Sequence, residues 1–344
     1  MRYKSLPSVS AEEKQETKDE IAKRQRQERR AELNYTETDY ARWTANRKRV
    51  EAGREINEIL ESLDLDVNID TIFGLKENLY PMLGGTKYRP YINRLLEETN
   101  PHFAKDGPLT LSDMQWLKSY IDSKAIDRFK KSLGHVKPHK ASGVSEFDAK
   151  YLVSKELMKT ECVFLSHGIS SEIKVVVTKD NVTTYWAHLD GVSVRGHPEG
   201  STWNSIPGAG APDGETELVI AIRQNKDGKW ELPSGNHGSS NLVLHEFGHA
   251  LDKVIGNKMD KNLFSQSPEF YRNWYYEFKA GNLKDLYYTQ SENNYETGLE
   301  ETFAEGFAKY YGSNGNSAAV TQYDWPWVTS YFYQTLLPKL KNEL

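Results

Sequence analysis

The apolar side chains of this chain follow different spacings in successive regions, and each spacing predicts a kind of element. Residues 8–33 contain few large apolar side chains and intersperse acidic with basic residues, which is typical of a solvated helix or a disordered arm. Trp43 belongs to a region in which apolar residues recur at helical spacing, so we expect it in a core. This spacing predicts helices over 35–63, 69–83, 91–98 and 111–133.

After residue 146 the pattern changes. One more helix is expected over 147–159. It is followed by strands over 173–178, 191–195 and 217–223 and then by a hairpin that turns at Asp227-Gly228. Strands followed by helices predict an α+β fold with a twisted mixed sheet. Either 217–223 or 191–195 is expected to form the sheet edge that lines a cleft, where an extended peptide could pair.

The segment 136–145 lies between these two regions and contains Pro138, so we interpret it as a linker. His135 and His139 are interpreted as surface histidines. The predicted organisation is therefore a charged arm over 1–34, an all-helical N-terminal domain over 35–140 and an α+β domain over 146–344.

One short motif in the α+β region carries most of the chemistry. The pentapeptide His245–His249 reads His-Glu-Phe-Gly-His, and two histidines four residues apart on a helix can bind one tetrahedral Zn²⁺. Glu246 would then lie where it can take a proton from the attacking water. The sequence predicts one zinc ion per chain, held by His245 and His249, with Glu246 as the general base.

The residues around the motif indicate where its helix begins and ends. Ser239 or Ser240 is predicted to cap the first turn, and Gly256 is predicted to end the helix in the left-handed conformation. Gly248 lowers the helix propensity by roughly 1 kcal/mol relative to alanine. We therefore expect another element to pack closely against that turn.

A catalytic zinc site needs a third protein ligand, and the segment Leu299–Tyr311 offers candidates. Drawn as a helix, it presents a broad apolar arc with Glu301 and Glu305 one turn apart at its edge. One carboxylate could bind zinc while the other accepts a hydrogen bond from a histidine.

Two other carboxylates stay open as candidates. Asp252 lies three residues after His249 on the same helix, so it could reach the metal or support a histidine. Glu300 lies nearer the middle of the apolar arc, and helix geometry alone does not exclude it.

Together these segments resemble the anthrax-lethal-factor-like zinc peptidases, a group that includes the catalytic domain of lethal factor and the Pro-Pro endopeptidases. The similarity rests on His245–Asp252, which reads HEFGHALD, and on Glu300–Phe307, which reads EETFAEGF. The stretches Trp203–Gly208 and Gly238–Leu242 add weaker support. The similarity covers roughly residues 150–344.

The resemblance implies a zincin-like metallopeptidase domain in which Glu301 is the third zinc ligand and Glu305 supports the site. It also implies a tyrosine before this helix that donates a hydrogen bond to the oxyanion. Tyr295 is the closest match, although its spacing is one residue short of the family's, and Tyr287 and Tyr288 stay open. The implied reaction is hydrolysis of a peptide bond in an extended protein or peptide by a bacterial toxin or effector.

Composition adds limits on partners and location. A net charge of −5 and a pI near 6 do not indicate a nucleic-acid-binding surface. The sequence contains no apolar run of the roughly 18–20 residues that span a bilayer, and its first residues lack the apolar core of a signal peptide. We expect secretion or delivery without a conventional signal peptide or, alternatively, a cytoplasmic location. The N-terminal helices could bind a delivery or substrate-recognition partner, and Cys162 is expected to be a buried, inert thiol.

Two other functions are compatible with the sequence. A non-catalytic binding module could retain the zincin fold, as a degenerate copy of the domain in lethal factor does, although the complete motif with Glu301 argues against this. A structural or phage-type protein could use the charged N-terminal helices for assembly and carry an accessory peptidase. Stoichiometric zinc without turnover would favour the first, and stable assembly by residues 1–135 would favour the second.

Overall fold

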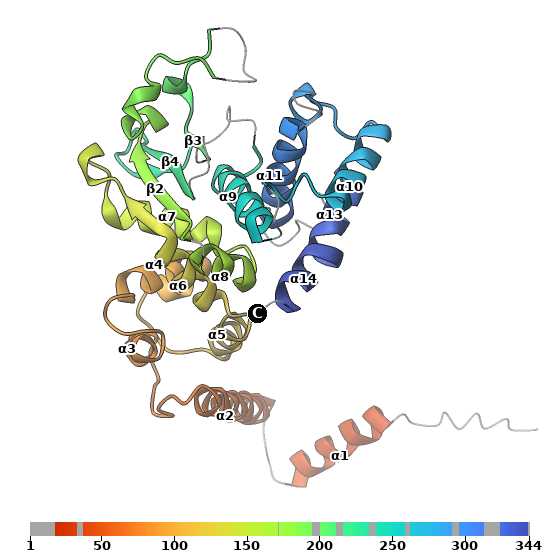
Figure 1. Ribbon diagram of the computed structural model, residues 1–344. Coiled ribbons are helices and arrows are strands. Elements are labelled where there is room, and N and C mark those ends of the chain that lie inside the picture. The colour runs from red at the N-terminus through yellow and green to blue at the C-terminus, as the bar shows by residue number, and fades with distance from the viewer. Residues whose placement is uncertain are drawn as a thin grey trace, which may run out of the picture. The chain divides into compact units, whose positions relative to one another are not determined.

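The structure of the chain is a computed structural model (Figure 1). It describes residues 18–32, 37–170, 172–194, 200–210, 216–233, 239–258, 262–290, 296–312 and 324–342. The chain divides into two compact units, Met1–Ile69 with Leu109–Gln115 and Asp70–Pro108 with Trp116–Leu344. The domain boundary expected at 140–146 falls inside the second unit. Among the described residues, no helix is long and apolar enough to cross a membrane.

The first unit contains two charged helices, α1 (Lys18–Glu32) and α2 (Glu37–Ser62). In α2, the Arg47 guanidinium bonds the Glu51 carboxylate four residues later at 2.8 Å, which supports the helix by a few tenths of a kcal/mol. Trp43 is 54% exposed, so its expected place in a core is wrong. The helical spacing predicts the helix correctly, but it does not show whether another element covers that face.

The helices that follow have boundaries close to those expected, with one interruption. Lys124 adopts a left-handed conformation with φ of 57°, which divides the helix expected over 111–133 into two. Cys162 is only partly buried at the start of its helix. The α-helices are α3 (Ile72–Met82), α4 (Arg89–Thr99), α5 (Leu111–Asp122), α6 (Ala125–His135), α7 (Glu146–Leu157), α8 (Cys162–Ser170), α9 (Leu242–Lys258), α10 (Pro268–Lys279), α11 (Glu296–Gly312), α13 (Pro326–Tyr331) and α14 (Leu337–Asn342). Shorter 3-10 turns are η1 (Pro101–Ala104), η2 (Lys140–Ser142), η3 (Val182–Thr184), η4 (Ala187–Leu189), η5 (Trp203–Ser205) and η7 (Leu286–Tyr288), and η8 (Phe332–Leu336) is a π-helix.

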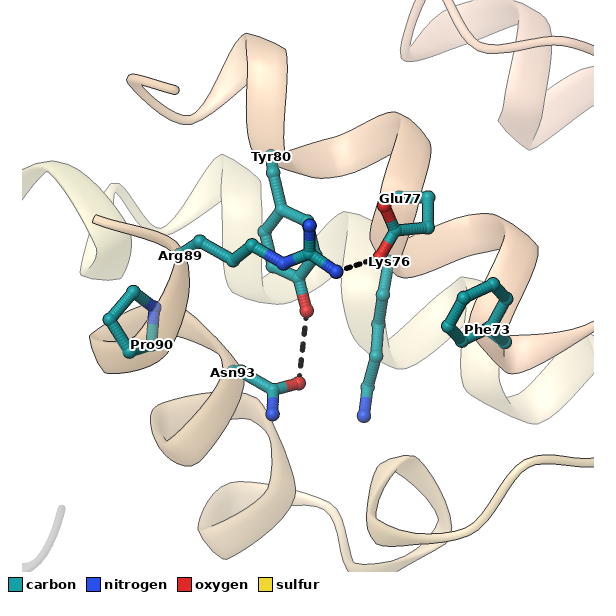
Figure 2. A pocket seen from close by; sticks show the side chains of 7 residues that line it. All are labelled: Phe73, Lys76, Glu77, Tyr80, Arg89, Pro90 and Asn93. Carbon is teal, nitrogen blue, oxygen red and sulfur yellow. Dashed lines mark hydrogen bonds and ion pairs between the residues drawn. The ribbon is translucent and has the colours of Figure 1, made fainter. Parts of the chain in front are cut away.

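Helices α3 and α4 pack around a pocket of about 320 Å³ (Figure 2). The polar groups in this pocket bind one another: Arg89 forms an ion pair with Glu77, and the Tyr80 hydroxyl donates to the Asn93 side chain at 2.9 Å. The Arg89 guanidinium also lies over the Tyr80 ring, 4.8 Å from its centre. These contacts join the two helices.

One mixed sheet forms the centre of the second unit. Its strands are β1 (Val136–Pro138), β2 (Lys174–Lys179), β3 (Gly208–Ala209), β4 (Glu217–Gln224) and β5 (Trp230–Glu231). The order is β1-β2-β4-β3, and β5 pairs with the end of β4. Strands β1, β2 and β4 are parallel, whereas β3 and β5 run antiparallel to β4.

Alternate residues of β2 and β4 point to opposite faces of the sheet, and both faces are covered. Val175 and Leu218 are paired, and both point into the large core formed with α7, α8, α9 and α11. Val176 and Val219, the next pair, point into a smaller cluster that contains Trp186. The core beneath the sheet therefore includes the helix that carries the zinc motif.

The structure corrects several details of the predicted sheet. The segment 217–223 is not an edge, because β4 pairs with β2 on one side and with β3 and β5 on the other. The segment 191–195 forms no strand in its described part, where Ser193 makes an isolated bridge to Thr202. The expected linker contains β1, in which Pro138 is tolerated because the strand lies at the edge.

The prediction for His135 is also wrong. Its side chain is buried, with Nδ1 3.0 Å from the carbonyl oxygen of Ile173 and Nε2 3.0 Å from that of Leu165. Its ring packs edge-on against Phe247 in α9, with centroids 5.4 Å apart. His135 is therefore a core residue, whereas His139 is partly exposed.

Candidate metal centre and active site

Helix α9 carries the zinc motif, and Asn241 fixes its first turn. The Asn241 side-chain oxygen accepts the N–H of Leu244 at 3.1 Å, so the cap is Asn241 rather than Ser239 or Ser240. The hydroxyl of Ser239 instead accepts the N–H of Asn241 itself at 3.2 Å. The helix begins at Leu242, one residue later than a cap at Ser240 requires and two later than a cap at Ser239 requires, and His245 falls in its first turn.

Helix α11 lies beside α9 because a glycine permits close packing (Figure 1). A methyl group built on Gly248 would lie only 3.0 Å from the Cα atom of Ala304. The expectation that another element packs against this turn is confirmed. This close approach sets Glu301, one turn before Ala304, opposite the two histidines.

Three side-chain atoms from these helices converge. The Nε2 atoms of His245 and His249 are 3.2 Å apart, and Glu301 Oε2 is 3.4 Å from each of them. Ligands at zinc distances of 2.0–2.1 Å in a tetrahedral site are separated by about 3.3 Å. Glu301 Oε2 is also a buried oxygen that accepts no hydrogen bond from the described residues. The triangle formed by His245 Nε2, His249 Nε2 and Glu301 Oε2 therefore has the dimensions and the free acceptor atoms that a zinc ion requires.

Glu305, one turn after Glu301, fixes the orientation of His245. Its Oε2 atom is 3.2 Å from His245 Nδ1, and its Oε1 atom accepts the N–H of Ser240 at 3.0 Å. Because Glu305 occupies Nδ1 as an acceptor, the proton is held there and Nε2 presents a lone pair to the triangle. Burial raises the pKa of Glu305, but the hydrogen bonds from His245 and Ser239 outweigh it and hold that pKa below its usual value.

Glu246 projects from α9 toward strand β3. A methyl group on Gly208 would lie 3.3 Å from Glu246 Cγ, and one on Gly210 would lie 3.7 Å from Glu246 Oε2. The backbone N–H of Gly210 also donates a hydrogen bond to the carboxylate. Burial raises the pKa of Glu246, which makes this carboxylate a stronger base than an exposed glutamate.

Comparison with known proteins agrees with this geometry. The family model "Anthrax toxin lethal factor, N- and C-terminal domain" matches residues 138–332, more than half of the chain. The chain belongs to the anthrax toxin lethal factor family. This confirms the resemblance inferred from the two helical motifs.

Two relatives of this lethal factor family member are named Pro-Pro endopeptidase. The one from Clostridioides difficile is 26% identical over 198 residues, which cover 57% of this chain and 79% of the relative. The one from Paenibacillus alvei is 30% identical over 110 residues, which cover 31% of this chain and 46% of the relative. A solved structure titled Pro-Pro endopeptidase PPEP-2 from Paenibacillus alvei is 22% identical with a TM-score of 0.44, covering 59% of this chain and 98% of that one.

The tyrosines of this lethal-factor-family site differ in what they contact. The Tyr287 hydroxyl hydrogen-bonds Glu301, and burial followed by the charges of Glu301 and Glu246 raises its pKa. The ring of Tyr288 packs edge-on against Trp325, with centroids 4.9 Å apart. Tyr295 lies outside the described residues, so its role stays a prediction.

The loop before α11 holds Tyr287 at this position. The backbone carbonyl of Tyr288 accepts the Trp274 indole N–H at 3.1 Å and the Thr302 hydroxyl at 3.4 Å. A methyl group on Gly298 would lie 2.8 Å from that same carbonyl oxygen. The loop therefore packs directly on the first turns of α11.

Neither of the other candidate carboxylates joins the triangle. Asp252 is buried, and its Oδ1 atom accepts the N–H of Ser265 at 2.6 Å. Burial raises the pKa of Asp252 to about 7. Its carboxylate ties α9 to the segment before α10, and its expected support of a histidine stays a prediction. Glu300 lies on α11 beside Glu301 but outside the cluster.

Two glycines contribute to the site in a way that the sequence alone does not predict. Gly208 and Gly210 allow β3 to approach Glu246 and His249, and the sequence signal is the short Gly-Ala-Gly run after Pro207. The prediction that Gly256 ends the helix is wrong. Gly256 lies inside α9, where a methyl group would lie 2.7 Å from the Leu263 backbone, so it permits close packing rather than ending the helix.

Proposed function

We propose that this chain is a zinc-dependent endopeptidase of the lethal-factor-like type that acts on a protein or peptide bound in extended form. The observation that carries the proposal is the triangle of His245 Nε2, His249 Nε2 and Glu301 Oε2, with sides of 3.2–3.4 Å, next to the buried Glu246. The two relatives named Pro-Pro endopeptidase support the choice of reaction.

A zinc ion held by the triangle would polarise the scissile carbonyl and make a water molecule more acidic. Glu246 takes a proton from the attacking water and later passes it to the nitrogen of the leaving amine, so that the carboxylate is regenerated. Its raised pKa suits both halves of this transfer. Glu305 keeps His245 in the tautomer that leaves Nε2 free.

The oxyanion donor is a tyrosine, and we propose Tyr287 for this role. Its hydroxyl already points to Glu301, and its raised pKa keeps the hydroxyl protonated and able to donate a hydrogen bond. Tyr295 is the rival that the family spacing favours. Paired variants at the two positions distinguish them.

We also propose a toxin or effector role, which the family's name supports. Secretion or delivery without a conventional signal peptide and a delivery or recognition role for the N-terminal helices stay predictions. The relatives' printed name makes peptides with a Pro-Pro bond the first substrates to test.

The test compares the wild type with Glu246→Gln and with Glu300→Gln as a matched control. Cleavage sites are identified by proteomics and in a peptide library that includes Pro-Pro bonds. We expect Glu246→Gln to keep one equivalent of zinc and its rate of hydrolysis to fall by about 10²–10⁴-fold. Glu300→Gln should keep both properties. Full activity of Glu246→Gln would exclude it as the base, and zinc binding by the wild type without any turnover would favour the non-catalytic binding module.

A further inference from the structure

The N-terminus of α9 is bound from outside the metal site by a residue of α7. Glu156 Oε2 accepts a hydrogen bond from the Asn241 side-chain amide at 2.5 Å. The same Asn241 side chain caps α9 through Leu244. Glu156 therefore holds the residue that fixes the first turn of the helix bearing His245, and its negative charge lies at the positive end of that helix.

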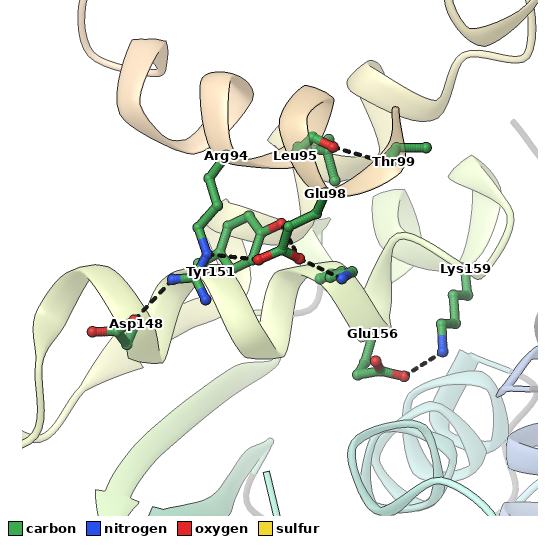
Figure 3. Close-up of polar contacts among 9 residues, drawn as sticks. Arg94, Leu95, Glu98, Thr99, Asp148, Tyr151, Glu156 and Lys159 are labelled. Carbon is green, nitrogen blue, oxygen red and sulfur yellow. Dashed lines mark hydrogen bonds and ion pairs between the residues drawn. The ribbon is translucent and has the colours of Figure 1, made fainter. Parts of the chain in front are cut away.

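Lys159, just after α7, binds the C-terminus of α11. Its Nζ atom donates to the backbone carbonyl of Gly312 at 3.2 Å. It also donates to the Glu156 carboxylate at 2.6 Å, as Figure 3 shows. A lysine charge at the negative end of a helix is favourable. Both side chains are largely buried, with 18% and 24% of their surface exposed. One ion pair thus joins the beginning of α9 to the end of α11.

These ends also touch each other directly. A methyl group on Gly312 would lie 2.8 Å from the Asn241 Cβ atom. The second close approach of the two helices is Gly248 against Ala304, next to the metal ligands. Two fixed points along a pair of rigid helices define how far one helix can slide or rotate against the other.

We propose that Glu156 and Lys159 are positioning residues for the metal site. By holding Asn241 and Gly312 together, they fix the register of α11 against α9, and therefore the separation of Glu301 from the two histidines. The proposal rests on the proposed function in that the triangle is taken to bind zinc. Neither side chain contacts the triangle, so their effect passes through the two helices.

Helix α7 also offers a matched control. Lys155, four residues before Lys159, donates to a glutamate at the same distance of 2.6 Å, but that partner is Glu98 on α4. Lys155 thus forms an ion pair of the same length near the end of α7, at a more exposed position, without touching α9 or α11 through any described contact. Its loss removes a comparable bond and leaves the two ligand helices joined.

The experiment measures the zinc dissociation constant and the visible spectrum of the Co²⁺-substituted full chain. We compare the wild type with Glu156→Ala, Lys159→Met and Lys155→Met. Loss of groups that orient metal ligands typically weakens metal binding by about 10–100-fold, and we expect about tenfold for Glu156→Ala and Lys159→Met. The cobalt spectrum should shift in both, because it reports ligand geometry rather than stability. Lys155→Met should match the wild type in both readouts.

Conservative variants keep the test decisive where a truncation unfolds the chain. Glu156→Gln retains an oxygen for Asn241, and Lys159→Arg retains the charge at Gly312, so both should bind zinc within about threefold of the wild type. Wild-type affinity and spectrum in folded Glu156→Ala and Lys159→Met would overturn the proposal while leaving the proposed function intact. If instead the wild type binds zinc but cleaves nothing, the endopeptidase assignment fails. A loss of zinc affinity in Glu156→Ala and Lys159→Met would still support the positioning role of these two residues.

Discussion

Two clusters of charged residues in the second unit contain similar side chains but are built differently. Around Glu98, every charge has an opposite partner: Arg94 and Lys155 donate to its carboxylate at 2.9 and 2.6 Å, and Arg94 also bonds Asp148. Around Glu301, two imidazole nitrogens face one carboxylate oxygen that accepts no hydrogen bond from the described residues. The first cluster is partly exposed, whereas the second is nearly buried.

This difference shows how a structural ion-pair network can be distinguished from a metal site. In the Glu98 network, donors match acceptors, which joins α4 to α7 and holds the pKa of Glu98 below its usual value despite burial. In the Glu301 cluster, the buried Oε2 atom of Glu301 accepts no hydrogen bond from the described residues, which is unfavourable unless a cation is bound. A surplus of acceptor atoms at ligand spacing therefore indicates function better than the number of charges does.

The largest expected effect is the loss of zinc binding when the Glu301 carboxylate is removed. Glu301→Ala should weaken zinc binding by more than about 100-fold, beyond the effect of losing a supporting residue, and hydrolysis should fall with it. Glu98→Ala should retain zinc and lower the free energy of unfolding by about 1–2 kcal/mol, because its partners are partly exposed. Isothermal titration with zinc and denaturant unfolding measure the two. Equal zinc affinities of the two variants would contradict the comparison.

The next effect concerns the tyrosine at the Glu301 cluster. Tyr287→Phe should lower kcat by about 10²–10³-fold with zinc content unchanged, because it removes one oxyanion donor. Tyr288→Phe, whose ring packs against Trp325, should change kcat little. Steady-state kinetics on a cleaved peptide measure both. A normal kcat for Tyr287→Phe together with a large loss for Tyr295→Phe would transfer the role to Tyr295.

A smaller effect is expected from the carboxylate that orients His245. Glu305→Gln keeps the side-chain shape but replaces the charged acceptor of the Nδ1 proton, so zinc affinity should fall by about 10–100-fold. A competition assay with a zinc chelator gives the dissociation constant. An affinity equal to that of the wild type would mean that the tautomer of His245 does not depend on Glu305.

A separate effect, on folding rather than on zinc binding or catalysis, is a pH dependence of stability caused by Asp252. Its pKa is raised to about 7 in the folded chain from an ordinary value of 3.8, so the folded state holds the proton more tightly than the unfolded state. The stability that this gives is complete below about pH 4 and is lost as the pH rises toward 7. Relative to Asp252→Asn, the zinc-free wild type should lose on the order of 2–4 kcal/mol between pH 4 and 8. Urea unfolding measures the free energy of unfolding of both proteins. The same difference between the wild type and Asp252→Asn at pH 4 and at pH 8 would contradict this.

Local chemistry could be predicted from the sequence, whereas features that depend on a distant neighbour could not. The spacing of His245 and His249 predicts that both imidazoles lie on one face, because the two residues are one helical turn apart. The family pattern at Glu301 also agrees with the triangle. The sequence predicts a serine cap rather than Asn241, whose side chain is held by Glu156, 85 residues away. The sequence does not show that His135 is buried, because its two carbonyl partners, Ile173 and Leu165, come from other segments.

The sheet shows the same limit. The apolar runs of β2 and β4 predict strands, but their order depends on pairings that no local pattern contains. The sequence of 217–223 allows an edge strand, because nothing in it indicates that the two-residue β3 covers β4. The edge next to Glu246 is therefore the short Gly208–Ala209 strand, whose glycine tolerates the approach of α9.

Zinc titration of the full chain, followed by X-ray absorption at the zinc edge, tests the central claim most directly. We predict one equivalent of tightly bound zinc with nitrogen and oxygen ligands at about 2.0–2.1 Å, lost together in His245→Ala, His249→Ala and Glu301→Ala. A wild-type chain that binds no zinc, or binds it equally well after all three substitutions, would contradict the account.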